Sequence, residues 1–341
     1  MLSSATDQGY AAMNLRRRSL LAGLATLPAA RASAGVPIRL GLLKTLSPAP
    51  FYLAQEAGKF AAEGVDVAFT FFQAAQPIAA AAVAGDIDLG VTALTGGFFS
   101  LAGKGALKVI GGALHEQKGI ELTAIIVSKQ AYAAGLTSIE TLAGHSFAIT
   151  QYGSSFHYMI GQLAARRCFD LKSITLRPLQ DIANMLAAVR TGQVDATMAI
   201  ASQAKPAAAS GDVHIIGWVG DHVPYQITAL FAASRFLAGN PDAVRRFARA
   251  YQQGVADYRA AFLATPATGT DAAIAAIQRY VFSGDLAAAA KIKAGIGWYD
   301  EGGALDVADV KSQLAWFQEQ GMVKGPIEAT DMIDTSFLPT R

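Results

Sequence analysis

VAGDIDLGV at residues 83–91 is repeated in plan by RTGQVDATM at residues 190–198, 107 positions later. Both stretches read Gly, any residue, Ile or Val, then Asp at the start of an apolar run. Carried back without a gap, the same offset pairs Gln73 with Gln180. Self-similarity at a fixed offset is typical of a duplicated supersecondary unit. The many alanines weaken the match, and two unrelated αβ segments of one large domain are the alternative.

Each copy predicts the order strand, helix, strand, helix, strand, because apolar runs alternate with amphipathic segments and with Gly or Pro turns. A mostly parallel sheet flanked by helices is the α/β arrangement that such an order favours. The sequence therefore predicts an α/β fold with one such sheet in each of two lobes. The expected strands lie at 38–43, 65–72 and 87–91 in the first copy and at 145–150, 173–179 and 194–200 in the second; the expected first helices lie at 51–60 and 156–167.

The rest of the chain fits around these copies. Crossings near residues 128 and 228 divide it into a first lobe, 35–128 plus 229–341, and a second lobe, 129–228. Two parallel crossings form a hinge, and parallel αβ sheets bind ligands outside the carboxyl ends of their strands, so we expect one cleft between the lobes. Further strands are expected at 107–111, 122–127, 214–219 and 227–233, a loop at 220–226, and helices at 240–258, 272–281, 286–292 and 307–320.

Composition excludes several function classes. Charged residues make up only 16% of the chain and the net charge is +2, so nothing indicates a nucleic-acid partner. A single cysteine, Cys168, excludes an internal disulfide framework and a thiolate metal cluster. The five histidines show no metal-ligand spacing, and we expect neither metal nor cofactor. Residues 67–85 carry no charge but include Gln73, Gln76 and Pro77, so we expect no stable membrane insertion.

The amino terminus has the pattern of an export signal. Residues 13–18 are basic, residues 19–28 form an apolar run too short to span a membrane, and residues 32–34 read Ala-Ser-Ala. We expect residues 1–34 to comprise an upstream extension and a cleaved signal, with a periplasmic mature protein beginning near Gly35. The paired arginines resemble a twin-arginine signal, and an ordinary secretory signal is the alternative.

The first turns of the two copies are the leading candidates for a binding site. Each turn precedes a helix, where free N–H groups favour an anionic or strongly polar ligand, and simple capping of the helix is the alternative role for the serines. Aromatic side chains in or beside the turns would form apolar walls, although each could instead pack in the core. The turn candidates are Ser47, Tyr52, Tyr152, Ser154, Ser155 and His157, the last binding an anion only when protonated.

Residues that follow the other strands complete the candidate site. Gln73 and Gln180 end equivalent strands and can both donate and accept hydrogen bonds, while Thr92 and Thr95 follow the third strand. The loop before the return to the first lobe adds Asp221 and Tyr225. Asp221 with His222 is also the one cluster suited to acid–base chemistry. Asp86, Asp88 and Asp195 more simply brace the Gly-Asp turns.

Several stretches of the mature sequence resemble the exported solute-binding proteins of ABC importers for nitrate, sulfonates, taurine and thiamine-pyrimidine precursors. The resemblance rests on PFYLAQEAGKF at 50–60, EGVDV at 63–67, AGDIDLG at 84–90, IETLAG at 139–144 and GQVDA at 192–196. It implies a two-lobed periplasmic binding protein fold of the second type. The cysteine motif of pyrimidine-synthesising relatives is missing, and Cys168 does not fit the cofactor attachment of a pyrrole-polymerising relative.

We therefore expect a non-enzymatic solute-binding protein that captures a small organic anion or a pyrimidine-like solute. The implied partners are the solute, an ABC permease and its ATPase, with the binding protein itself a monomer. A sulfonate, a taurine-like solute or an aromatic acid is preferred to nitrate, because Lys44 is the only cation near the inner turns and the tyrosines suit an apolar group. A secreted enzyme that uses Asp221 and His222 is the alternative.

Overall fold

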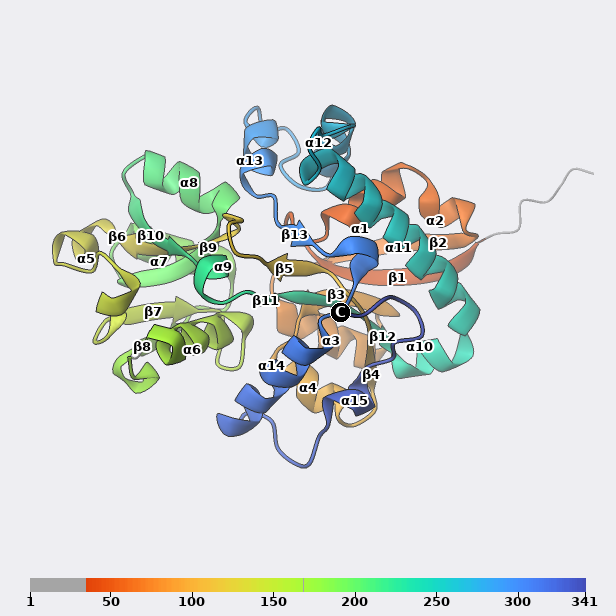
Figure 1. Ribbon diagram of the computed structural model, residues 1–341, viewed down its shortest axis with the longest axis horizontal. Helices are drawn as coiled ribbons and strands as arrows, with labels where there is room; N and C mark the ends of the chain where they lie inside the picture. Colours follow the sequence, from red (N-terminus) through yellow and green to blue (C-terminus); the bar gives the residue numbers. More distant parts are fainter. Residues whose placement is uncertain (1–34, 168) are drawn as a thin grey trace, which may run out of the picture. The chain divides into compact units, whose positions relative to one another are not determined.

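The computed structural model describes residues 35–167 and 169–341 (Figure 1). The predicted export signal and Cys168 lie outside the described residues.

The first sheet has five strands in the order β2-β1-β3-β12-β4. Strand β1 pairs in parallel with β2 and β3, while β12 runs antiparallel to both of its neighbours, so four of the five strands share one direction. The inner strands β3 and β12 are buried throughout. The bounds are β1 Val36–Leu43, β2 Val65–Phe72, β3 Leu89–Ala93, β4 Leu107–Gly112 and β12 Thr228–Ala233.

The second sheet repeats this plan in the order β10-β6-β9-β7-β8. Strand β7 pairs in parallel with β8 and β9, and β6 runs antiparallel to β9 and β10. When the second sheet is read from its β8 edge, each strand has a counterpart in the first sheet. Strands β8, β7, β9, β6 and β10 correspond to β2, β1, β3, β12 and β4. The bounds are β6 Thr123–Ser128, β7 Ser146–Ile149, β8 Thr175–Pro178, β9 Ala196–Ile200 and β10 Val213–Trp218.

The predicted order strand, helix, strand, helix, strand is confirmed in both copies. The first helix of the first copy was expected at 51–60, but it breaks into α1 and α2 at Gly58, whose positive φ of 66° ends one helix and starts the next. The remaining helices lie close to their expected positions. The helices of the copies are α1 Ala49–Glu56, α2 Lys59–Ala62, α3 Ala75–Ala84, α6 Ser155–Arg167 and α7 Ile182–Arg190, with α4 Gly96–Ala102, α5 Lys129–Ala133 and α8 Ala201–Ala209 after them.

Strand β6 belongs to the second sheet, although the division at residue 128 placed this segment in the first lobe. All six of its residues are buried and apolar or small, so the sequence gives no sign of which sheet it joins. We call the first sheet with its helices the first lobe and the second sheet with its helices the second lobe.

A third sheet, β11-β5-β13, lies where the chain crosses between the lobes. Strand β5 precedes the second sheet and β11 follows it, so the two crossing segments pair with each other. The expected loop at 220–226 contains instead a short helix and β11, because the crossing segments bond to each other. The bounds are β5 Leu114–Glu116, β11 Tyr225–Gln226, β13 Trp298–Tyr299 and α9 Val219–His222.

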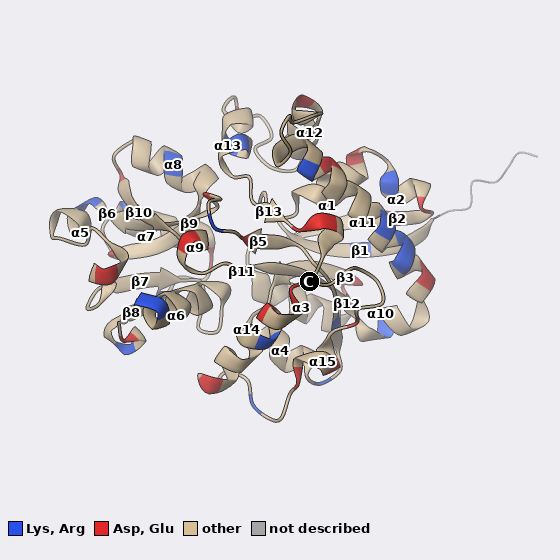
Figure 2. Ribbon diagram, viewed as in Figure 1, with Lys and Arg blue, Asp and Glu red and all other residues tan. Residues whose placement is uncertain are grey.

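The carboxy-terminal part is helical, as predicted, and packs mainly on the first lobe (Figure 1). Phe51 is fully buried and stacks on Tyr251 of α11 at 4.2 Å between ring centroids, which confirms it as a core residue. Figure 2 shows that charged residues lie mainly on helices and loops. No described helix has both the length and the apolar character needed to cross a membrane. The bounds are α10 Ser234–Gly239, α11 Pro241–Phe262, α12 Thr270–Gln278, α13 Ala288–Ala294, α14 Val307–Glu319 and α15 Ala329–Met332.

Candidate functional site

The two Gly-Asp turns fix the sheets from which the site is built. The Asp88 carboxylate accepts hydrogen bonds from the Arg39 backbone N at 2.9 Å and from its side chain at 2.7 and 3.0 Å. The Asp195 carboxylate accepts from the Ser146 backbone N and Oγ, both at 2.8 Å. Arg39 and Ser146 are themselves 107 positions apart. The predicted brace is therefore the same bond made twice, tying the third strand of each copy to its first.

Both braces lower the pKa of the carboxyl group. Burial by itself raises the pKa of Asp88, but the hydrogen bonds and charge of Arg39 outweigh it and hold the pKa below its ordinary value. Burial likewise opposes the shift at Asp195, where the hydrogen bonds from Ser146 and the nearby His145 lower the pKa. Both groups therefore stay ionised at neutral pH and act as fixed acceptors.

A cavity of about 350 Å³ lies between the two lobes. Every strand of the two copies contributes to its wall just after the strand's carboxyl end, which is where αβ sheets bind ligands. One lining residue from each of the six strand ends, in chain order, is Lys44, Gln73, Thr95, Thr150, Asp181 and Ile200.

Helix N-termini supply much of the polar character of this cavity. Helices α3 and α8 begin at or next to lining residues, and no described side chain caps their first turns. Helix α1 offers no free N–H group there, because the Ala49 and Phe51 N–H groups donate to the carbonyls of Leu46 and Pro48 and residue 50 is proline. Helix α7 differs, because the Asp181 carboxylate accepts a hydrogen bond from the Asn184 backbone N at 2.8 Å and so caps it. Uncapped N-termini attract anions through their N–H groups and dipoles. The helix N-termini that can favour an anion at this cavity are therefore those of α3 and α8.

The remaining wall is mostly apolar and carries little charge. Among the described lining residues, Lys44 is the only cation and Asp181 the only acid. Phe72 and Phe156 add aromatic surface from the first and second lobes respectively. The site can therefore hold one ionised group with an attached apolar body.

Five of the twelve expected site residues line this cavity: Ser47, Gln73, Thr95, Ser154 and Ser155. Two of them, Thr95 and Ser154, are also caps, and the alternative interpretation expected this for Ser154. The Thr95 hydroxyl accepts from the Phe98 backbone N at 3.1 Å, and the Ser154 hydroxyl accepts from the His157 backbone N at 3.3 Å.

Two expected site residues lie behind the wall instead. Tyr52 is fully buried, donates its hydroxyl to the carbonyl oxygens of Leu43 and Thr45 at 3.3 and 3.2 Å, and stacks on Tyr280. Thr92 donates its hydroxyl to the Ala75 carbonyl at 3.0 Å. Both side chains point back toward the backbone of the first copy, so they hold the turns that line the cavity without reaching it.

Tyr152 and His157 flank the second turn but lie outside the cavity. The Tyr152 side chain is exposed, and its ring meets the edge of the His157 ring. His157 is buried and its Nδ1 accepts from the Gly153 backbone N at 3.2 Å. Burial lowers the pKa of His157 to about 4. The imidazole is neutral at neutral pH, so the expected cationic role of His157 is replaced by packing.

Gln180 is exposed and lies outside the cavity, although its repeat partner Gln73 lines it. Its backbone has a positive φ of 73°, which ordinary side chains rarely adopt. Its N–H donates to the Thr150 carbonyl at 2.9 Å. The chain turns at Gln180 before α7 begins, and this turn directs the Gln180 side chain away from the cavity.

The Asp221, His222 and Tyr225 cluster also lies outside the cavity. The exposed Asp221 carboxylate accepts from the Gly119 backbone N at 3.0 Å, and His222 Nδ1 faces the Arg167 guanidinium. Burial and that guanidinium lower the pKa of His222. Tyr225 is fully buried opposite Glu116 in the third sheet. The three side chains serve the crossing segments and do not converge on a reacting position.

Sequence reasoning missed several cavity residues, most clearly Gln76 and Gln151. The Gln151 amide donates to the Gln76 side-chain oxygen, so these two side chains bridge the lobes beside the cavity. Gln151 follows the carboxyl end of β7, and that position was the one usable signal. Gln76 falls inside the first turn of α3, where periodicity alone favours a solvent-facing residue.

The arrangement of two copied sheets around a cavity agrees with comparisons with known proteins. The family model described as NMT1/THI5 like matches residues 46–261. The chain belongs to the NMT1/THI5-like family. This confirms the resemblance found in the sequence. No protein with a curated description matches this NMT1/THI5-like chain.

Solved structures share the fold of this NMT1/THI5-like protein. The alkanesulfonate-binding protein SsuA from Xanthomonas axonopodis pv. citri, bound to MOPS, has a TM-score of 0.70 and 18% identity over 88% of this chain and 99% of its own. The periplasmic aliphatic sulphonate binding protein SsuA from Escherichia coli gives 0.67 and 18% over 88% and 92%. The periplasmic nitrate-binding protein NrtA from Synechocystis PCC 6803 gives 0.56 and 16% over 73% and 67%. The predicted periplasmic binding protein fold is confirmed.

Proposed function

We propose that this protein is the extracytoplasmic solute-binding component of an ABC importer and captures a small organic anion between its lobes. The observation that carries the proposal is the cavity itself, in which two uncapped helix N-termini, those of α3 and α8, and Lys44 face an otherwise largely apolar wall. Each helix terminus stabilises an anion by about 0.3–1 kcal/mol. A micromolar dissociation constant needs roughly 8 kcal/mol, which these groups, hydrogen bonds and apolar burial together supply.

The size of the cavity favours an organic solute over nitrate. A volume of about 350 Å³ leaves room for an apolar body beside the ionised group. Phe72 and Phe156 offer aromatic surface for that body. An alkyl or aryl sulfonate or an aromatic carboxylate satisfies both demands, and a pyrimidine-like solute is the second candidate because a planar ring suits the same surface.

The proposed contacts are divided between the lobes. Lys44, Ser47 and Gln73 would hold the solute from the first lobe, with Thr95 beside them, and Ser154 and Ser155 would hold it from the second. A ligand that touches both lobes binds the closed form more tightly and shifts the population toward it. Recognition of this closed form would then let the permease and its ATPase accept the solute.

Binding without turnover is the role that the site geometry favours. Asp181, the one acidic residue among the described lining residues, already caps α7. Asp221 and His222, the expected acid–base pair, point to other partners outside the cavity. We therefore prefer a binding protein to a secreted enzyme on the same fold.

A thermal-shift screen tests the proposal directly. The purified protein is heated with alkyl and aryl sulfonates, aromatic carboxylates, pyrimidines and nitrate. A ligand at one hundred times its dissociation constant stabilises the fold by about 2.7 kcal/mol and raises the midpoint. We expect the organic anions to raise it and nitrate not to do so. A shift with nitrate alone would contradict the choice of solute, and chemical conversion of a stabilising compound would contradict the absence of turnover.

A further inference from the structure

Helix α14 contacts both lobes as well as the crossing between them. It packs against α4, which follows the last strand of the first copy, and against α6 of the second copy. It also contacts β11, one of the two crossing strands. Figure 1 shows α14 beside α4, with α6 on its other side. One helix from the carboxy-terminal part therefore bridges the two lobes outside the two crossing segments.

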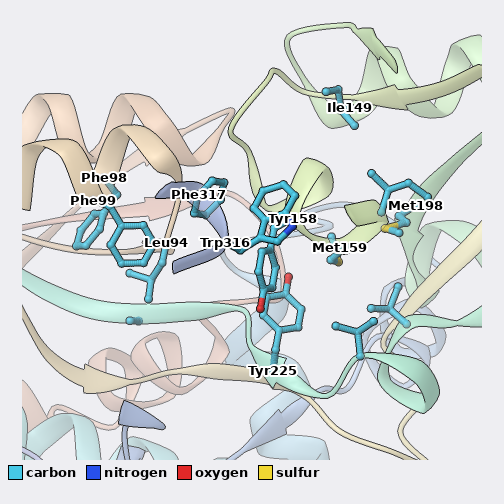
Figure 3. Packing of buried hydrophobic residues seen from close by; sticks show 14 of the residues in the cluster. Leu94, Phe98, Phe99, Ile149, Tyr158, Met159, Met198, Tyr225, Trp316 and Phe317 are labelled. Carbon is cyan, nitrogen blue, oxygen red and sulfur yellow. The ribbon is translucent and has the colours of Figure 1, made fainter. Parts of the chain in front are cut away.

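Trp316 forms the contact of α14 with the second lobe. Its ring packs edge to face with the His157 ring at a centroid distance of 5.3 Å. It packs in the same way with the Tyr158 ring at 5.4 Å (Figure 3). Gly161 leaves the space for the indole, because a Cβ atom at that position would lie 2.4 Å from Trp316 Cζ2. Only 8% of Trp316 is exposed. The second lobe thus has a notch, formed by these residues of α6, that the indole fills.

Phe317, the next residue, forms the contact with the first lobe. Its ring lies 5.8 Å from the Phe99 ring of α4, and it is fully buried (Figure 3). A Cβ atom at Gly96 would stand 3.5 Å from the Phe317 ring. The Phe317 ring also lies 5.9 Å from the Tyr158 ring of α6, so Phe317 touches both lobes, whereas the ring contacts of Trp316 outside its own helix are with α6. The lobes cannot separate without breaking contacts of these two adjacent residues.

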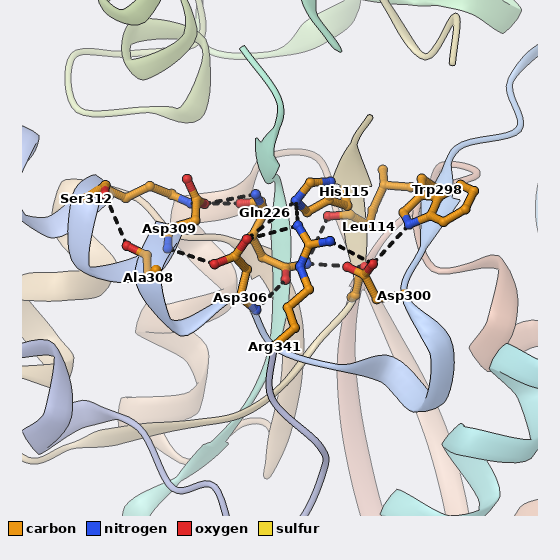
Figure 4. Close-up of polar contacts among 12 residues, drawn as sticks. Leu114, His115, Gln226, Trp298, Asp300, Asp306, Ala308, Asp309, Ser312 and Arg341 are labelled. Atoms are coloured by element: carbon orange, nitrogen blue, oxygen red, sulfur yellow. Dashed lines mark hydrogen bonds and ion pairs between the residues drawn. The ribbon is translucent and has the colours of Figure 1, made fainter. Parts of the chain in front are cut away.

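The helix is also tied to the crossing strand β11. The Asp309 carboxylate accepts from the Gln226 backbone N at 2.9 Å, and the Gln313 side chain donates to the Gln226 carbonyl at 2.8 Å (Figure 4). The Gln226 side chain in turn donates to the carbonyls of Ala113 and Leu114 on the other crossing segment. These bonds fix α14 at the hinge while its far end reaches α6.

We propose that α14 straps the lobes together and that Trp316 is a positioning residue that sets how readily the ligand cavity opens. This inference rests on the proposed function, since it assumes that the solute enters by separation of the lobes. Opening moves α6 away from α4, and α14 stays with the first lobe through Phe317 and β11. Trp316 then leaves its notch, so its contacts exist in the closed form and stabilise it.

The lobes also meet directly beside the cavity, which explains why the strap need not act alone. The Gly96 backbone N donates to the Gly153 carbonyl at 2.9 Å, joining the start of α4 to the turn before α6. Gln76 and Gln151 add the side-chain bridge. These contacts line or border the cavity, whereas Trp316 does not line it. Trp316 can therefore affect solute binding only by changing the position of α6.

Distances between the lobes test the strap without any ligand. Cysteines replace the exposed Lys104 in the first lobe and Lys172 in the second, in a Cys168→Ser background, and spin labels report their separation. We expect Trp316→Leu to shift the distribution toward longer distances. Phe247→Leu is the matched control, because Phe247 is equally buried but packs on Phe51 and Phe60 within the first lobe. It should lower the melting temperature and leave the distances unchanged.

Gly161→Ala provides a second variant, since the added methyl displaces the indole without removing any aromatic side chain. It should lengthen the distances between the lobes as Trp316→Leu does. Both variants should bind the solute found in the screen about tenfold more weakly, because they reduce the population of the closed form. Unchanged distances in both variants would overturn the strap. If the distances lengthen but the thermal-shift screen finds no solute, the role of α14 as a strap is supported and only the proposed function is contradicted.

Discussion

The two copies share their framework and differ in what they show to the cavity. In both, the second, first and third strands lie side by side in parallel, and an aspartate bonds to the backbone of the first strand 49 residues earlier. At the cavity, however, the first copy contributes Lys44 and Gln73, while the second contributes Asp181 in place of an outward-turned Gln180. The two copies thus share the bonds that hold each sheet together and differ in the turns that face the cavity.

The difference makes the distribution of charge around the cavity asymmetric. The cation and the uncapped helix α3 belong to the first copy, whereas α7 of the second copy is capped by the Asp181 carboxylate. An ionised group is therefore best placed toward the first lobe. In the proposed complex, Ser154, Ser155 and Phe156 of the second lobe would then close over the rest of the solute.

The largest expected effect compares the two braces. Asp88→Ala removes an acceptor that is 7% exposed and bonded to three Arg39 donors, so we expect a loss of about 3 kcal/mol in the free energy of unfolding. Asp195→Ala should cost less, about 2 kcal/mol, because its side chain is 36% exposed. Urea unfolding measures both. Asp88→Asn keeps an acceptor for the Arg39 backbone N and should restore part of the loss; equal losses in the two copies would contradict the ranking.

The next effect concerns Glu116 of β5, one of the two strands that cross between the lobes. Burial raises the pKa of Glu116 from its ordinary 4.5 to about 8, so the folded protein holds a proton that the unfolded chain releases between these values. This contribution is complete below pH 4.5 and is lost as the pH rises through 8. Between pH 7 and 8 wild type should lose up to about 1.4 kcal/mol relative to Glu116→Gln, which keeps a neutral side chain. Parallel pH dependence of the two proteins in urea unfolding would contradict the shift.

A smaller effect separates the equivalent glutamines. Gln73→Asn shortens a side chain that lines the cavity, and we expect about fivefold weaker binding of the solute, or about 1 kcal/mol. Gln180→Asn makes the same change at the equivalent position outside the cavity, where Asn also tolerates the positive φ. Calorimetric titration should show unchanged affinity for Gln180→Asn. Equal weakening in both variants would place the solute elsewhere.

No effect on the pH dependence of solute affinity is expected from substitution of His157. Its pKa of about 4 keeps the imidazole neutral, so the pH profile of solute affinity between pH 5.5 and 8 should be the same in wild type and in His157→Gln. Titrations at four pH values check this. A loss of affinity near pH 6.5 in wild type that disappears in the variant would restore the cationic role expected from the sequence.

Much of the framework could be predicted from the sequence because it depends on local and periodic signals. The 107-residue offset predicted six strands, their parallel order within each copy and the bracing role of Asp88 and Asp195. Apolar runs fix where strands form, and Gly followed by Asp fixes where they begin. These signals lie within a few residues of the feature they predict, so no long-range contact has to be known.

The cavity wall could be predicted only in part. Ser47, Gln73, Thr95, Ser154 and Ser155 follow strand ends and do line it, because the carboxyl ends of parallel strands meet at one edge. The direction of each side chain depends on the backbone beyond the strand. Tyr52 turns back to its own strand and Gln180 turns outward at a positive φ, and neither choice is visible in residue type.

The sequence by itself determined the repeat, the α/β plan and the strand ends around which the cavity forms. Only the tertiary structure decided that β6 joins the second sheet, that Gln76 meets Gln151, and that Trp316 of α14 fills the notch at Gly161. The physical reason is distance along the chain. Periodicity records which face of an element is buried, whereas the partner that buries it is chosen by packing among segments far apart in the chain, 155 residues in the case of Trp316 and Gly161.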